Sequence, residues 1–328
     1  MANGAVLFCP NCSAAAHRQP LDTGLKCPHC GKRWPVLAHG TDFIPVLLPD
    51  VAAAERMAAL CNAMLAKPDT LGRWVDGEDA LELALAGGLL TYAQAHFGAY
   101  CAPPLQQPDF GWLAHALPQS LPEGPVAILG AGPGGEAWAL RDAPILSGRQ
   151  TWVVDANLAA LAWGQMLFDN GSVVLPYRSS ATRIDFATAT LPDRAPEVRW
   201  LCADALFPPF AAGSLAVVVT VGLLDSVADP FALIQQVEAL LQRDGVWIMA
   251  SPYNWQNRIT PAKLQCERHF GEALPDGMVA LLSGRKISGI GADLQPEWRD
   301  DDIVWRLQVH PRYTAEYRMQ AIRLRKVA

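Results

Sequence analysis

From residue 125 onward the sequence alternates short apolar runs with segments of helical periodicity, and this alternation limits the fold more than any other feature. Apolar runs of four to seven residues are typical of strands that are buried on both faces. Such strands occur in parallel sheets that helices cover on both sides. Five strands are predicted in this way: Val126–Leu129, Thr151–Val154, Val198–Cys202, Leu215–Val221 and Val246–Ala250. The alternation therefore predicts an α/β fold built from βαβ units.

The segments near the fifth predicted strand extend this fold. A helix before that strand is expected to bury one apolar face, formed by Phe231, Ile234, Val237 and Leu241. Arg243-Asp244-Gly245 is expected to end this helix. Two further strands are predicted in the tail, at Ile303–His310 and Tyr313–Lys326.

Composition excludes several classes of protein. Of the 328 residues, 51% are hydrophobic and 18% are charged, so the chain can bury a core and is not disordered as a whole. The net charge of −6 gives no overall basic field, which disfavours a nucleic-acid partner but leaves a local basic patch open. A fibrous protein, a coiled coil and a small disulfide-rich protein are excluded.

The compartment is predicted from what the sequence lacks. No basic segment followed by an apolar stretch stands at the start, so no secretory signal is expected. Two charge-free runs, residues 83–108 and 205–224, contain glycines, prolines or polar residues that do not suit a membrane span. Four of the eight cysteines are scattered, as is usual for thiols in a reducing compartment. We therefore expect no membrane segment and a cytoplasmic location.

The other four cysteines form two pairs near the amino terminus. Cys9-Pro-Asn-Cys12 and Cys27-Pro-His-Cys30 have the spacing at which two tight turns present four sulfurs to one zinc ion. Redox activity and disulfides are the alternatives, but a redox pair needs only one motif and a reducing compartment disfavours disulfides. Four sulfurs leave no open coordination position. The predicted Zn²⁺ is therefore structural.

A glycine-rich loop follows the first predicted strand of the α/β region. Gly130, Gly132, Gly134 and Gly135 stand between that strand and a helix, where a ligand can approach the backbone. Asp155 ends the next strand, where its carboxylate can accept both hydroxyls of a ribose. The loop fits NAD, FAD or S-adenosylmethionine. Asp155 can also be a helix cap or a solvated loop acid.

The rest of the region resembles class I S-adenosylmethionine-dependent methyltransferases over residues 120–255. The resemblance depends on Leu201-Cys-Ala-Asp204-Ala-Leu, on Phe207-Pro-Pro-Phe210 before Gly213-Ser214, and on the following strand. It implies a Rossmann-like sheet of seven strands that binds S-adenosylmethionine. The implied cofactor-binding residues are Gly130, Ala131, Gly132 and Gly134 for the methionine moiety, Asp155 and Ala156 for the ribose, Asp204 and Ala205 for the adenine, and Gly222 beside the methyl group. The family usually has an acid at the position of Ile128, so either another group binds the amino group of the donor or the affinity for the donor is lower.

Similar zinc ribbons precede several methyltransferases, among them the rRNA guanine methyltransferases. The segment Ser251-Pro-Tyr253-Asn-Trp255 is similar to the methyltransferase domain of ovothiol synthases, which act on an imidazole. Composition divides the chain into the predicted zinc ribbon at 1–50, an Ala- and Leu-rich helical cap or linker at 51–117 and a methyltransferase domain at 118–328. Within that domain, an insertion at about 251–300 is expected to bind the acceptor. The predicted partner is a small polar or heteroaromatic molecule with a nitrogen or sulfur nucleophile.

Candidate catalytic residues are those expected near the donor methyl group. Tyr253, Tyr92 and His96 are candidates for binding or deprotonating the acceptor, and ordinary packing is the alternative for each. Trp255 and Trp305 are candidates for stacking on a planar acceptor. Arg323 and Arg325 share one face of a strand, which suits either an anionic group or a solvated surface.

Three other functions fit parts of the sequence. An RNA base methyltransferase would use the ribbon to grip RNA, but the ribbon offers few basic residues. A nicotinamide or flavin oxidoreductase fits the glycine loop, but no second nucleotide motif is present. A non-catalytic scaffold that binds the donor also remains open, and the oligomeric state is not predicted.

Overall fold

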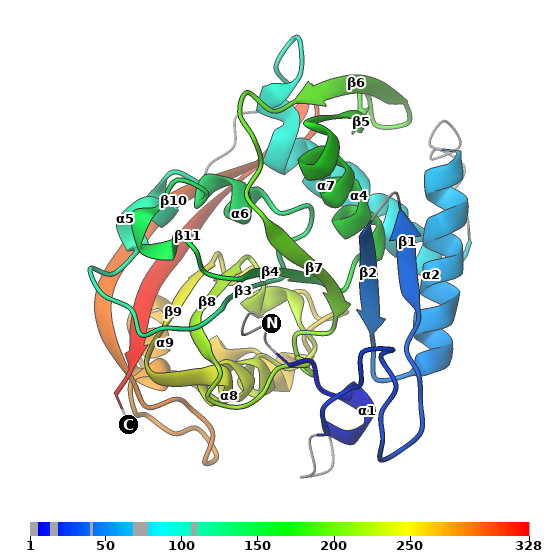
Figure 1. Ribbon diagram of the computed structural model, residues 1–328. Helices are drawn as coiled ribbons and strands as arrows, with labels where there is room; N and C mark the ends of the chain where they lie inside the picture. The colour runs from blue at the N-terminus through cyan, green and yellow to red at the C-terminus, as the bar shows by residue number, and fades with distance from the viewer. Residues whose placement is uncertain (1–5, 14–18, 40–41, 68–77, 106–109, 328) are drawn as a thin grey trace.

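The computed structural model describes residues 6–13, 19–39, 42–67, 78–105 and 110–327. Within these residues a nine-stranded sheet runs through the molecule in the order β1-β2-β7-β4-β3-β8-β9-β11-β10 (Figure 1). In this order, the six strands β2, β7, β4, β3, β8 and β9 run parallel to one another. The pairs β1–β2, β9–β11 and β11–β10 are antiparallel. The predicted Rossmann-like α/β class is confirmed.

The strands and helices have the following bounds. The sheet contains β1 (Val36–His39), β2 (Asp42–Leu47), β3 (Val126–Leu129), β4 (Thr151–Asp155), β7 (Val198–Ala203), β8 (Leu215–Val221), β9 (Leu241–Ser251), β10 (Leu294–His310) and β11 (Tyr313–Lys326). The helices are α1 (Pro10–Ser13), α2 (Val51–Ala66), α4 (Ala80–Phe97), α5 (Trp112–Ala116), α6 (Gly135–Ala139), α7 (Leu158–Asn170), α8 (Pro230–Leu240) and α9 (Leu274–Leu282). Helices α4 and α7 pack together, while α8 packs against β9 (Figure 1).

Short polar side chains start the longer helices. Asp50, Asp79, Asn157 and Asp229 each precede a helix and accept hydrogen bonds from its first-turn amides. These bonds satisfy amides that have no partner within the helix, which places the four helix starts. Pro230 adds a residue whose fixed φ angle suits the first helical position of α8.

The sheet has two more strands than predicted because the amino-terminal segment joins it. Strand β2 pairs in parallel with β7, through Val46 opposite Cys202 and Leu47 opposite Ala203, and β1 pairs with β2. The ends of α8 and β9 also correct the prediction. Leu241 begins β9 opposite Leu215, so the helix ends at Leu240 and Arg243-Asp244-Gly245 lies within the strand.

A separate hairpin, β5 (Ser172–Arg178) and β6 (Ile184–Thr190), was not predicted. It lies at the top of the view in Figure 1, beside α4 and α7. Much of β6 is exposed or half-exposed, and a proline interrupts β5. The hairpin therefore lacks the continuous apolar runs that reveal the central strands.

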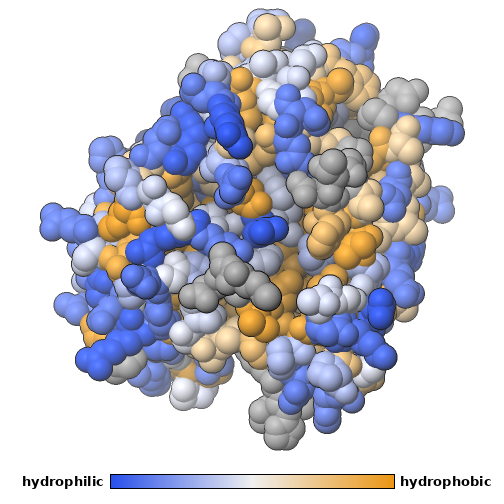
Figure 2. Space-filling model, viewed as in Figure 1, coloured by the Kyte–Doolittle hydropathy of each residue, from blue (hydrophilic) through white to orange (hydrophobic). Residues whose placement is uncertain are grey.

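Hydrophilic and hydrophobic side chains are interspersed on the face of the molecule shown in Figure 2. In the described part of the chain, no helix is both long and apolar enough to cross a membrane. The core is continuous from the amino-terminal cysteines to the tail strands, with β3 fully buried at its centre. The amino-terminal segment therefore shares its core with the α/β region.

Candidate functional site

The four predicted metal ligands lie together. The sulfur atoms of Cys9, Cys12, Cys27 and Cys30 are all within 4.8 Å of one another. Two of the distances, Cys9 Sγ to Cys30 Sγ and Cys12 Sγ to Cys27 Sγ, are 3.8 Å. A disulfide needs about 2.0 Å, whereas a tetrahedron with zinc–sulfur bonds of about 2.3 Å has edges of about 3.8 Å. The cluster therefore fits a four-sulfur zinc site.

The cluster contacts the α/β region. The backbone amides of Cys12 and Cys30 lie 3.4 and 3.5 Å from the sulfurs of Cys9 and Cys27, in position to donate to thiolates. Beside the cluster, the Phe8 amide donates to the Pro209 carbonyl at 2.9 Å. The Phe8 contact connects the segment beside the first cysteine turn to the chain between β7 and β8.

A second site lies at the carboxyl ends of the central parallel strands. A cavity of about 540 Å³ is lined by residues at the carboxyl ends of β3, β4, β7, β8 and β9. The strand order reverses at β3, because the next strand along the chain, β4, lies on one side of β3 and the later strand β8 lies on the other. Ligands of open α/β sheets bind at such a reversal of strand order. A larger hollow of about 860 Å³ lies at the amino ends of β3, β4 and β7 and contains none of the predicted cofactor residues.

Seven of the nine predicted cofactor-binding residues line this cavity. They are Gly130, Gly132, Asp155, Ala156, Asp204, Ala205 and Gly222. Ala131 and Gly134 are not among its lining residues. Ala131 is buried and its amide donates to the Val154 carbonyl at 3.1 Å. Gly134 has a φ of +90° at the start of α6, where a Cβ would lie 3.0 Å from the Trp200 ring. Both residues therefore help to fix the shape of the loop.

Asp155 connects the glycine loop to the end of β4. One carboxylate oxygen accepts from the Gly132 amide at 2.8 Å, and the other accepts from the Asn157 amide at 2.6 Å. Burial raises the pKa of Asp155, and the backbone amides that donate to its carboxylate oppose that rise. Each oxygen keeps a lone pair, so the oriented carboxylate can still accept from a vicinal diol.

His96 lies on α4 and faces the same loop. Its Nδ1 accepts from the Gly135 amide at 3.1 Å, and burial lowers the pKa of the imidazole to about 3. The ring is therefore neutral near pH 7, with its proton on Nε2. His96 lines the cavity as predicted. In this tautomer it is a hydrogen-bond donor to a ligand, and no longer a candidate for the general base.

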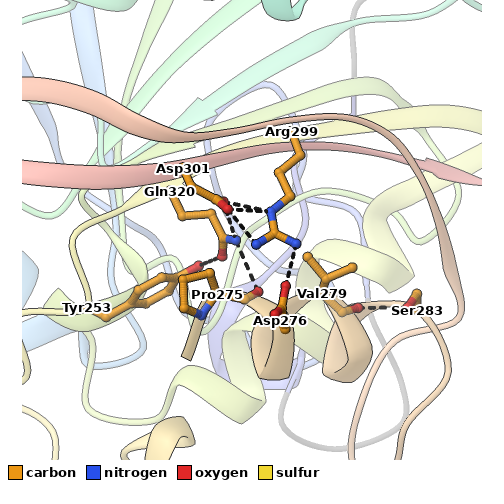
Figure 3. Close-up of polar contacts among 8 residues, drawn as sticks. All are labelled: Tyr253, Pro275, Asp276, Val279, Ser283, Arg299, Asp301 and Gln320. Atoms are coloured by element: carbon orange, nitrogen blue, oxygen red, sulfur yellow. Dashed lines mark hydrogen bonds and ion pairs between the residues drawn. The ribbon is translucent and has the colours of Figure 1, made fainter. Parts of the chain in front are cut away.

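Tyr253 is not among the residues that line the cavity. It has a φ of +53°, so the chain bends directly after β9. Its hydroxyl donates to Gln320 Oε1 at 2.6 Å, and Gln320 donates in turn to Asp301 at 2.8 Å (Figure 3). Arg299 bridges Asp301 and Asp276 and so connects β10 to α9 (Figure 3). The Tyr253 hydroxyl thus belongs to a network between the insertion and the tail strands.

Three further candidates, Trp255, Arg323 and Arg325, also have structural partners. Trp255 stacks on Tyr253 with ring centroids 6.2 Å apart and does not line the cavity. Arg323 and Arg325 both pair with Glu297, and both donate to backbone carbonyls. These arginines hold β11 to its neighbours and are not at the cavity.

Helix α4 and the tail hairpin also contribute to the wall of the cavity. Tyr92 and Trp305 line it as predicted, together with Tyr317, which sequence reasoning missed. The ring of Trp305 lies 6.0 Å from the ring of His96, at 85°. A further missed residue, Asp225, accepts from the Ser251 hydroxyl at 2.9 Å and from the Asn254 amide at 2.8 Å. Its position in an acidic turn directly after β8 was the available signal.

The cavity is acidic. Its described lining includes four carboxyl groups, from Glu136, Asp155, Asp204 and Asp225, and no lysine or arginine. Close carboxylates disfavour further negative charge and favour a ligand that carries positive charge. The cavity therefore suits a neutral or cationic ligand.

No family model matches the chain, and no curated protein is similar to it. Similar solved structures include the CurJ carbon methyltransferase (13% identity, TM-score 0.47, 85% of this chain and 68% of that one). They also include a SAM-dependent methyltransferase from Methanosarcina mazei (15%, 0.37, 66% and 96%) and the SpnF cyclase (12%, 0.39, 67% and 80%). Similarity at this level carries no information about the reaction, so the function depends on the cavity itself.

Proposed function

We propose that the chain is an S-adenosylmethionine-dependent methyltransferase. The observation that carries this proposal is the Asp155 carboxylate, oriented by two backbone amides beside Gly130 and Gly132 in a cavity whose described lining includes no lysine or arginine. Asp155 would accept the ribose hydroxyls, and Asp204 with Ala205 would face the adenine. The backbone of the glycine loop would lie along the methionine moiety.

Charge separates this proposal from the oxidoreductase alternative. NAD and FAD carry a pyrophosphate, which needs amides or cations to balance its negative charge. S-adenosylmethionine instead carries a sulfonium and an α-ammonium against a single α-carboxylate, and this net positive charge suits a described lining of carboxyl groups without lysine or arginine. When bound, it supplies an electrophilic methyl group on sulfur.

The acceptor is proposed to be a small polar or heteroaromatic molecule with a nitrogen or sulfur nucleophile. It would lie between Tyr92 and His96 on α4, and Trp305 and Tyr317 on the tail hairpin. The aromatic rings would hold a planar molecule, while the Nε2–H of His96 and the Asp225 carboxylate would orient it for in-line attack. The enclosing elements would exclude water from the reacting atoms. The acidic lining disfavours phosphorylated acceptors and RNA.

Zinc is proposed as a second, structural component. Cys9, Cys12, Cys27 and Cys30 would fill its coordination shell, and the 3.8 Å sulfur distances support this ligand set. The ion would stabilise the amino-terminal strands against β7, and a cytoplasmic location would keep the other thiols reduced.

A methyl-transfer assay tests the proposal. Purified protein is incubated with S-adenosylmethionine and separate thiols, imidazoles, amines, phosphorylated analogues and unmodified RNA, and S-adenosylhomocysteine is measured. We expect turnover on a neutral or cationic small molecule, and a lower kcat for Asp225→Asn than for the control Glu197→Gln, which lies in the other hollow. Turnover confined to RNA, with a steep dependence on salt, would contradict the small-molecule acceptor.

A further inference from the structure

Glu136 is a buried acid with an unsatisfied oxygen in the proposed donor site. It stands in the first turn of α6, is 2% exposed and lines the cavity. Its Oε2 has no hydrogen-bond partner among the described residues. Buried carboxyl oxygens are normally hydrogen-bonded, so an unpartnered one at a cavity wall indicates a missing ligand group.

The surroundings of Glu136 supply no positive charge. Its Oε2 lies 3.9 Å from His96 Nδ1, but that nitrogen already accepts from the Gly135 amide and the ring is neutral. The Asp155 carboxylate on β4 raises the pKa of Glu136 further. Tyr92 on the facing helix is neutral near pH 7, and no lysine or arginine is among the described lining residues.

We propose that Glu136 binds the α-ammonium group of the methyl donor. This inference rests on the proposed function and assigns one residue within it. The adenosine end would lie at Asp155 and Asp204, which directs the amino-acid end along the glycine loop toward α6. An ammonium there would donate to the unsatisfied Glu136 oxygen and balance its charge. It would also replace the acid that is absent at Ile128.

Proton release gives this contact a signature of its own. Burial raises the pKa of Glu136 to about 8, so the carboxyl is mostly protonated at pH 7 when the site is empty. An ammonium bound against it favours the ionised form, so the O–H proton leaves to the solvent as the donor binds. Ligand binding at pH 7 is then expected to release close to one proton.

The test compares two ligands of the full-length protein by calorimetry: S-adenosylhomocysteine, and its analogue with hydrogen in place of the α-amino group. The wild-type protein is expected to bind S-adenosylhomocysteine at least about tenfold more tightly, the range of a charged hydrogen bond. Glu136→Gln is expected to reduce this preference to a few-fold. The control Glu197→Gln is expected to keep it.

Titrations in two buffers of different ionisation heat count the protons. The wild-type protein should release close to one proton with S-adenosylhomocysteine and close to none with the deaminated analogue. Equal wild-type affinity for the two ligands would overturn the inference even if Glu136→Gln did not fold. Failure of S-adenosylmethionine and both analogues to bind would instead overturn the proposed function.

Discussion

Burial of single acidic side chains gives the site its chemistry, and Glu136 is the clearest case. Its pKa in the folded protein is about 8, above the ordinary value of 4.5, because burial disfavours the charged form. The contribution of this group to the free energy of unfolding is therefore fully present below pH 4.5, and it is lost as the pH rises through 8. Removing this titration should therefore help the empty protein most at alkaline pH.

We expect Glu136→Gln to gain stability relative to the wild-type protein as the pH rises. From pH 6.5 to pH 8.5, the free energy of unfolding of the variant minus that of the wild-type protein should rise by about 2 kcal/mol, from the pKa shift of Glu136 alone. His96 and Asp155 are present in both proteins and largely cancel. Urea unfolding at the two pH values, without ligand, measures the difference. A difference that does not change with pH would contradict the buried, protonated state of Glu136.

Tyr253→Phe tests whether this hydroxyl is structural. The change leaves the buried Gln320 oxygen without its donor, so the free energy of unfolding should fall by about 1–3 kcal/mol. The kcat and acceptor KM should stay close to those of the wild-type protein. Tyr313→Phe, at an exposed tyrosine, is the control for both measurements. A large loss of kcat with unchanged stability would contradict the structural role and indicate that Tyr253 takes part in the reaction.

These residues show how far the sequence predicts a site. Gly130, Asp155 and Asp204 could be predicted because the carboxyl ends of parallel strands meet at one edge of the sheet. Tyr253 could not be placed, since the positive φ after β9 decides where its side chain points. Glu136 was missed because its significance lies in an unpartnered buried oxygen, which no spacing reveals.

At the scale of elements, helix α7 sets the position of the glycine loop. A Cβ at Gly164 would lie 2.2 Å from the Pro133 carbonyl oxygen, so this helix can approach the loop only through a glycine. The central strands were predictable because they are continuous apolar runs. This contact was not, because a glycine within a helical pattern does not show which backbone it meets.

Gly164→Ala is therefore expected to force α7 away from the loop. We expect a loss of about 1–3 kcal/mol of stability, as in other overpacked sites, together with weaker donor binding. The control is Gly87→Ala in α4, where a Cβ meets nothing within 4 Å and helix propensity predicts a gain of up to about 1 kcal/mol. Urea unfolding and donor titration of both variants measure the contrast. Equal behaviour of the two variants would contradict the proposed close contact.

At the scale of the molecule, the amino-terminal cysteines and the α/β region share one core. The sequence predicted the cysteine cluster. It did not show that β2 pairs with β7, because these strands are far apart in the sequence and no local pattern specifies their pairing. Strand β7 leads directly to Asp204 in the cavity. Loss of the proposed zinc should therefore affect the whole protein.

We expect one zinc ion per chain by elemental analysis, and none in Cys27→Ser. Because metal binding supplies folding energy, this variant should unfold at a lower temperature than the wild-type protein and bind the donor more weakly. Cys266→Ser changes a buried cysteine outside the cluster and should keep its zinc. A wild-type protein without zinc, or full occupancy in Cys27→Ser, would contradict the metal site.

Calorimetric titration with S-adenosylmethionine, NADH and FAD tests the central claim most directly. We expect S-adenosylmethionine to bind at one site per chain, and Asp155→Asn to weaken it at least about tenfold through lost charged hydrogen bonds. Asp142→Asn, at an exposed carboxylate outside the cavity, should bind it like the wild-type protein. Binding of NADH or FAD without binding of S-adenosylmethionine would contradict the assignment of this cavity to a methyl donor.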